Sequence, residues 1–179
     1  GDTSRTRCGE RKVKMPIIGH GDIASVLTDR EDRIFFASGV SNSQETRESA
    51  YAREKTLLLQ QEKIRHLVYF SSLSIFYSDT RYAQHKLEME TLVKANFPRY
   101  AIIRLGNITW GTNPHTIINS FRAKIQKDEP LIIRDAYRYV VDKDEFLYWV
   151  SMIPSWPCEI SITGQRLSIE QIVKKYGYE

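Results

Sequence analysis

Short apolar runs alternate with segments of helical periodicity along most of this chain, and this alternation restricts the fold more than any other feature of the sequence. Residues 33–38, 66–71 and 100–105 have the apolar character of strands buried on both faces of a sheet. Helical patterns lie between them, over residues 46–63 and 82–95. Strands joined by helices form a parallel sheet with crossover helices, so we predict an α/β fold.

The sequence predicts further, shorter elements. Strands are expected at residues 13–18, 131–134, 137–141 and 159–163, and helices at 22–27 and 116–126. Two capping boxes complete the pattern: Asp142 to Glu145 begins a helix that runs to residue 151, and Ser168 to Gln171 begins a final helix that Gly177 ends.

A chain of 179 residues fits one domain, and we expect residues 15–179 to form it, with a small lobe from about residue 112. Residues 1–14 hold five basic and two acidic side chains and so carry +3 of the chain's net charge of +4. The basic character therefore belongs to a polar tail, which we interpret as a disordered leader or tag. A nucleic-acid partner is not expected.

The remaining composition favours a cytoplasmic protein. No apolar stretch is long enough to span a membrane, and residues 1–14 lack the apolar segment of a secretory signal. The two cysteines, Cys8 and Cys158, form no disulfide framework. The four histidines are dispersed without paired ligand spacing, so no metal site is expected.

A glycine turn follows the first predicted strand. Gly19-His20-Gly21-Asp22-Ile23-Ala24 reads G-x-G-x-x-A at the head of a predicted helix. In such turns the first glycine permits the tight bend and the second lets a pyrophosphate approach the backbone, while the small third residue lets helix and strand pack closely. The acidic residue that would hold the adenosine ribose about 20 positions on is missing, because the chain there reads Ser38-Gly39.

A tyrosine and a lysine share one helix face at Tyr82 and Lys86. A lysine ammonium lowers the pKa of a neighbouring phenol, which lets the phenol exchange a proton with a substrate hydroxyl or carbonyl. Tyr51–Lys55 and Tyr139–Lys143 have the same spacing. Only Tyr82 follows a buried strand that ends in serines, at the sheet edge where ligands of open α/β sheets bind, so we select that pair.

Taken together, these residues resemble the extended short-chain dehydrogenase/reductases, the class of the NAD-dependent nucleotide-sugar epimerases and dehydratases. The resemblance rests on the glycine turn, FASGV at 36–40, VYFSS at 68–72, YAQHK at 82–86, IIRLGNITWG at 102–111 and RYVVDKDEF at 138–146, in the family's order. It implies a Rossmann-type sheet of reduced strand number, because only about a dozen residues separate the glycine turn from FASGV.

The resemblance also implies roles for individual residues. Ser72, Tyr82 and Lys86 would be catalytic, with Ser71 and Ser74 as alternatives to Ser72. NAD or NADP would contact Gly19, His20, Gly21, Asp22, Ile23, Ala24, Ala37, Ser38, Gly39, Lys86 and Leu105, the last standing where the family has a proline. The substrate would contact Ser74, Asn107 and Arg138.

The leading hypothesis is therefore an NAD(P)-dependent oxidoreductase, epimerase or dehydratase that acts on a sugar-like substrate, such as a nucleotide-sugar for surface polysaccharides. The alternative is a catalytically degenerate dinucleotide-fold protein with a binding or regulatory role, which the missing strands and the missing acid favour. A homodimer through the helices at 46–63 and 82–95 fits the resemblance, and their apolar stripes permit it without requiring it.

Overall fold

The computed structural model describes residues 16–179. The predicted leader, and the part of the first predicted strand that precedes residue 16, lie outside these residues. A parallel five-stranded sheet has the order β1-β2-β3-β4-β7. Its strands are β1 (Ile17–Ile18), β2 (Arg33–Phe36), β3 (His66–Ser72), β4 (Tyr100–Leu105) and β7 (Cys158–Ile162). The predicted Rossmann-type α/β fold with few strands is confirmed.

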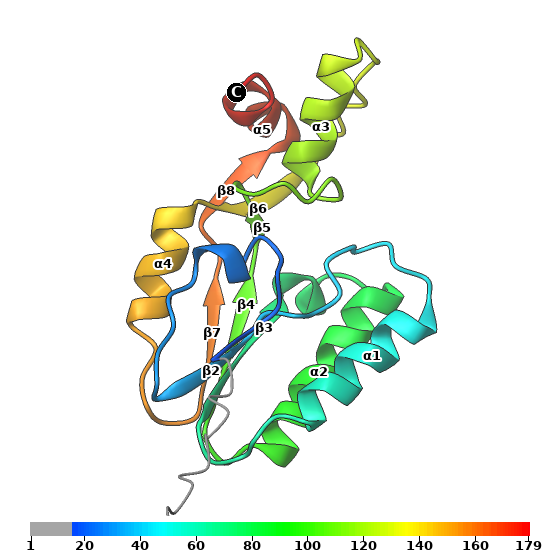
Figure 1. The fold of residues 1–179 in the computed structure, drawn as a ribbon. Helices are drawn as coiled ribbons and strands as arrows, with labels where there is room; N and C mark the ends of the chain where they lie inside the picture. The colour runs from blue at the N-terminus through cyan, green and yellow to red at the C-terminus, as the bar shows by residue number, and fades with distance from the viewer. Residues whose placement is uncertain (1–15) are drawn as a thin grey trace, which may run out of the picture.

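Two helices cover one face of this sheet, α1 (Glu48–Leu59) and α2 (Arg81–Asn96) (Figure 1). Leu58 of α1 and Met89 and Val93 of α2 are fully buried against apolar side chains of β2, β3 and β4. The Thr80 hydroxyl caps α2 by accepting a hydrogen bond from the Ala83 amide. This cap fixes the first turn of α2, which carries Tyr82.

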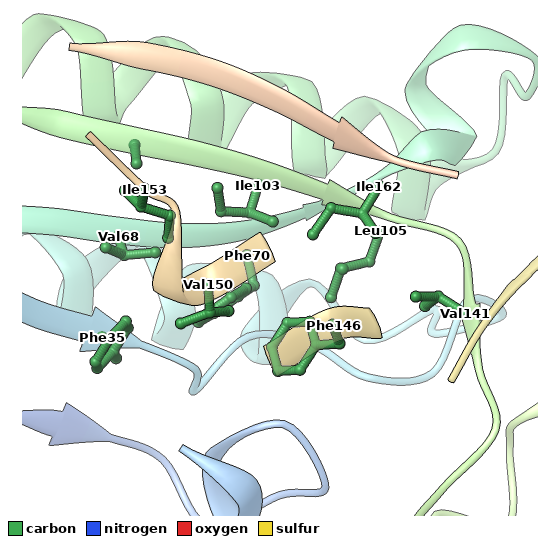
Figure 2. Close-up of a cluster of buried hydrophobic side chains, with 11 residues drawn as sticks. Phe35, Val68, Phe70, Ile103, Leu105, Val141, Phe146, Val150, Ile153 and Ile162 are labelled. Atoms are coloured by element: carbon green, nitrogen blue, oxygen red, sulfur yellow. The ribbon is translucent and has the colours of Figure 1, made fainter. Parts of the chain in front are cut away.

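The opposite face is covered by α4 (Lys143–Ser151) and the short 3₁₀ turn η1 (Ala24–Val26). Figure 2 shows Phe146 and Val150 of α4 against Phe35, Phe70 and Leu105 of the sheet. The connection after β1 thus packs on one face, and the connection after β2 packs on the other. Such a change of face marks the switch point at which open α/β sheets bind ligands.

A smaller lobe lies beyond the carboxyl ends of the strands (Figure 1). It holds a second sheet of order β5-β6-β8, made of β5 (Asn107–Ile108), β6 (Tyr137–Val141) and β8 (Gln165–Ser168). Helices α3 (Ile117–Gln126) and α5 (Ile169–Tyr176) pack on it around Ile118, Val140 and Ile172. Helix α4 and strand β7, which follow residue 112 in the chain, pack with the main sheet.

Three local predictions are wrong. Residues 131–134 form no strand, because they pair with neither sheet and leave Ile132 and Ile133 exposed. The predicted helix 22–27 is only the three-residue turn η1. The side chain of Asp142 does not cap α4, since its Oδ1 accepts hydrogen bonds from Thr109 and Tyr176 instead. The predicted box at Ser168 and Gln171 is confirmed.

Candidate functional site

The glycine turn joins β1 to η1 at the switch point. Gly19 has φ +123°, and a Cβ there would lie 2.3 Å from the Ala37 carbonyl oxygen, so this position requires glycine. A Cβ on Gly21 would meet nothing within 4 Å, which leaves open space at the second glycine. Ala24 is buried, as the packing role of the third small residue requires. Since η1 has three residues, it offers no helix dipole for a phosphate.

The carboxylate of Asp22 ties the glycine turn to a distant loop. It accepts hydrogen bonds from the backbone amides of Thr112 and Asn113, each at 2.9 Å, and the Trp110 indole donates to the Asp22 carbonyl. Asp22, which the sequence predicts as a cofactor contact, also lines the cleft described below. Both oxygens of the Asp22 carboxylate nevertheless already accept hydrogen bonds from residues 112–113.

The serines at the end of β3 point to different partners. Ser71 is buried, and its hydroxyl donates to the Glu90 carboxylate at 2.7 Å. Glu90 in turn accepts from the Arg104 guanidinium. The Ser72 hydroxyl instead donates to the Ser74 hydroxyl at 2.8 Å, and both residues line the cleft. Of the two neighbouring serines, Ser72 is therefore the one with its hydroxyl free of the buried network around Glu90.

Tyr82 and Lys86 occupy the first two turns of α2, on the side that faces the cleft. Tyr82 is half-buried, and the Lys86 ammonium lies 5.6 Å from the centre of its ring. Lys86 is 4 % exposed and donates hydrogen bonds to the Tyr69 hydroxyl at 3.3 Å and the Phe70 carbonyl at 3.5 Å. Its ammonium is thus held at the floor of the cleft.

A buried carboxylate, which sequence analysis missed, accompanies Lys86. Glu54 of α1 lies 3.8 Å from the Lys86 ammonium and accepts hydrogen bonds from the Tyr69 hydroxyl and the Val40 amide. It also bonds the His85 ring at 3.0 Å. Burial by itself raises the pKa of Glu54, but the Lys86 charge and these hydrogen bonds outweigh it and lower the pKa to about 2. Burial beside Glu54 raises the pKa of Tyr69.

The other two tyrosine–lysine pairs lie elsewhere. Tyr51 is fully buried and donates to the Glu45 carbonyl, while Lys55 pairs with Glu88 on α2. Tyr139 lies on β6 and Lys143 begins α4, so the members of that pair belong to different elements and do not share a helix face. Only Tyr82 and Lys86 line the cleft together.

One cleft of about 770 Å³ collects nearly all the predicted site residues at the carboxyl edge of the sheet. In the order of the strands, one end is lined by residues that follow β1 and β2 (His20, Gly21, Ile23, Ala37, Ser38 and Gly39) and the other by Leu105 and Asn107 at the end of β4, with Ser72 of β3 between them. Tyr82 and Lys86 of α2 and Arg138 of β6 also line the cleft. Gly19 and Ala24 are not among the lining residues. Within residues 16–179, no cluster of three or more potential ligands could hold a metal ion.

The chain has the fold of several nucleotide-sugar enzymes. No protein-family model and no curated protein matches the sequence. The Bordetella bronchiseptica enzyme WbmG in complex with NAD has a TM-score of 0.63 and 14% identity over 80% of this chain and 55% of its own. UDP-glucuronic acid 4-epimerase from Bacillus cereus has a TM-score of 0.64 and 14% identity over 78% of this chain and 58% of its own. UDP-glucose 4-epimerase from Thermotoga maritima has a TM-score of 0.64 and 13% identity over 81% of this chain and 61% of its own.

The chain therefore spans little more than half the length of these neighbours. What it shares with them is the Rossmann-type architecture. No helix within residues 16–179 is long and apolar enough to cross a membrane.

Proposed function

We propose that this chain is an NAD(P)-dependent enzyme of the epimerase, dehydratase or reductase kind, with Ser72, Tyr82 and Lys86 as its catalytic group and a sugar-like substrate. The observation that carries the proposal is the single cleft at the switch point of the sheet, which unites the glycine turn with these three side chains. A sugar-nucleotide substrate is supported by the structural neighbours, because the Bacillus cereus complex contains NAD and UDP-4-deoxy-4-fluoro-glucuronic acid and the Thermotoga maritima complex contains UDP-glucose.

The residues at the glycine-turn end fit the diphosphate part of a dinucleotide. The open space at Gly21 leaves its backbone accessible, and Ala37, Ser38 and Gly39 line the adjacent wall. Lys86 and Leu105 would lie toward the nicotinamide. A bound nicotinamide would supply the hydride donor or acceptor.

The catalytic side chains would handle the proton and the substrate oxygen. Tyr82 would exchange a proton with a sugar hydroxyl or carbonyl, while the Ser72 hydroxyl orients that oxygen and the Lys86 ammonium stabilises the phenolate. In the cleft Arg138 would pair with a phosphate of the substrate, with Asn107 and Ser74 beside it. The proposal includes a cytoplasmic location and a homodimer, both of which rest on the sequence and the family resemblance.

Binding of NADH and NADPH, followed by nicotinamide fluorescence, tests the cofactor. Turnover of a panel of UDP-sugars with and without added NAD(P) then tests the chemistry. Tyr82→Phe should abolish turnover while keeping cofactor affinity and fold. Tyr51→Phe removes the hydroxyl of a tyrosine with identical lysine spacing outside the cleft and should retain turnover. Full activity of Tyr82→Phe would refute the assignment.

A second candidate is a catalytically degenerate dinucleotide-fold protein. Two observations favour it: no strand within residues 16–179 pairs with the outer edge of β1, and Lys86 is held by Glu54. The outer side of β1 is where doubly wound sheets place the strand that binds the adenosine ribose. Cofactor binding without turnover of any sugar nucleotide would support this candidate, and reproducible turnover would eliminate it.

A further inference from the structure

The glycine-turn end of the cleft lacks the usual sources of positive charge for a diphosphate. Rossmann-type sites place the phosphates at the N-terminus of a full helix, whose dipole and free amides attract them. Here the turn is followed only by the three residues of η1. Asp22, a carboxylate within the turn itself, adds negative charge. A diphosphate at this end would therefore need a cationic side chain from another element.

Arg53 of α1 reaches this end of the cleft from the crossover helix. Its guanidinium donates to the Ser38 carbonyl at 2.8 Å and approaches the Ser38 hydroxyl at 3.4 Å. Ser38 follows Ala37, whose carbonyl packs directly beneath Gly19. Arg53 is thus anchored to Ser38, the sequence neighbour of the residue that contacts Gly19, and it lines the same cleft.

The charge of Arg53 is not neutralised by its helix neighbours. Glu54 points inward to Lys86, His85 and Tyr69, and Lys55 pairs with Glu88. Within the described part of the chain, Arg53 forms no ion pair with a carboxylate, although it is exposed at the cleft. Its only hydrogen-bond partners there are the carbonyl and hydroxyl of Ser38, which leave guanidinium donors available to a ligand.

We infer that Arg53 is the cationic ligand for the diphosphate of a dinucleotide bound at the glycine turn, in place of the missing helix N-terminus. This inference rests on the proposed function and names a binding residue for the same cleft. The position of Arg53 relative to β1 indicates whether it would contact the diphosphate or a ribose 2′-phosphate. Arg53 lies on the β2 side of β1, whereas the adenosine ribose of a doubly wound sheet lies on the opposite side. A ribose 2′-phosphate is therefore not its expected partner.

The test compares Arg53→Gln and Arg53→Lys with the unaltered protein in fluorescence titrations with NADH and with NADPH. Losing the charge-assisted contact should weaken binding about tenfold for Arg53→Gln. The factor should be the same for both cofactors, since both carry the diphosphate. Arg53→Lys keeps the charge and should recover most of the affinity. Lys55→Gln, the same change of charge two residues along α1 but outside the cleft, should bind both cofactors as the unaltered protein does.

The outcomes separate this inference from the function on which it rests. If the unaltered protein binds neither cofactor, both proposals fail together. If it binds them and Arg53→Gln binds equally well, only the role of Arg53 is overturned. A loss confined to NADPH would also overturn the inference, because it would place the guanidinium at the 2′-phosphate. Thermal unfolding of each variant checks that the fold is retained.

Discussion

Lys86 and Glu54 form a buried ion pair beneath the cleft, with the ammonium 3.8 Å from the carboxylate and neither residue more than 4 % exposed. The pair joins α2 to α1, and Glu54 extends the connection to the loop after β2 by accepting the Val40 amide at 2.6 Å. Gly39 makes this approach feasible, because a Cβ there would lie 2.7 Å from the Lys86 ammonium. The position of the proposed catalytic lysine is thus set by a carboxylate on a different helix.

Replacing Glu54 by Gln should destabilise the protein by about 3 kcal/mol, because it leaves the Lys86 charge buried without a counter-charge. Urea denaturation at neutral pH measures the loss. Glu88→Gln is the matched control, since Glu88 pairs with Lys55 in a partly exposed ion pair and should cost less than about 1 kcal/mol. Equal losses of stability for the two variants would show that the buried Lys86–Glu54 pair contributes no more than a partly exposed ion pair.

The contribution of Glu54 should also depend on pH. Its pKa is about 2 in the folded protein and 4.5 as the ordinary value that the unfolded chain has. The stability supplied by the ionised carboxylate is therefore fully present above pH 4.5 and is lost as the pH falls toward 2. The difference in free energy of unfolding between the unaltered protein and Glu54→Gln should shrink over this range. Denaturant titrations at several pH values test this, and a constant difference would contradict it.

The strands of the main sheet could be predicted because strands buried on both faces have unbroken apolar runs in the sequence. The strands at residues 66–71 and 100–105 could be predicted without knowledge of the tertiary structure, and β3 and β4 match these ranges within one residue. Strand β8 was missed because Gln165–Ser168 is mostly polar and joins the lobe sheet through backbone pairing with β6. Such a strand has no apolar periodicity to detect.

Residues that line the cleft could be predicted where they belong to a sequence motif, and the carboxylate beneath the cleft was missed because its role depends on packing between helices. The tyrosine, lysine and serines lie on one strand–helix unit, so their spacing sufficed. Glu54 had a readable signal, because it lies four residues from both Ala50 and Leu58, on the stripe of α1 that faces the sheet. A carboxylate on a buried stripe requires a cationic partner. That the partner is Lys86 could come only from the packing of α1 on α2.

The two glycines of the turn should respond differently to alanine. Gly19→Ala places a side chain at φ +123° and against the Ala37 carbonyl, so it should cost more than about 2 kcal/mol of stability. Gly21→Ala meets no neighbouring atom and should cost less than about 1 kcal/mol. Its methyl group would nevertheless reduce cofactor affinity if the diphosphate approaches the backbone there. Thermal unfolding and NADH titration of both variants distinguish these effects.

The adjacent serines at the end of β3 should separate stability from catalysis. Ser71→Ala removes the hydroxyl that donates to buried Glu90, and should cost about 1–2 kcal/mol of stability while leaving turnover intact. Ser72→Ala loses only the contacts with Ser74, which cap the short turn Leu73–Phe76, and should cost less than about 1 kcal/mol of stability. Its turnover of a UDP-sugar accepted by the unaltered protein should fall by a factor of about 100, the scale of removing a group that acts on the reacting oxygen. Denaturation and steady-state kinetics on both variants test the assignment, and the opposite pattern would transfer the catalytic role to Ser71.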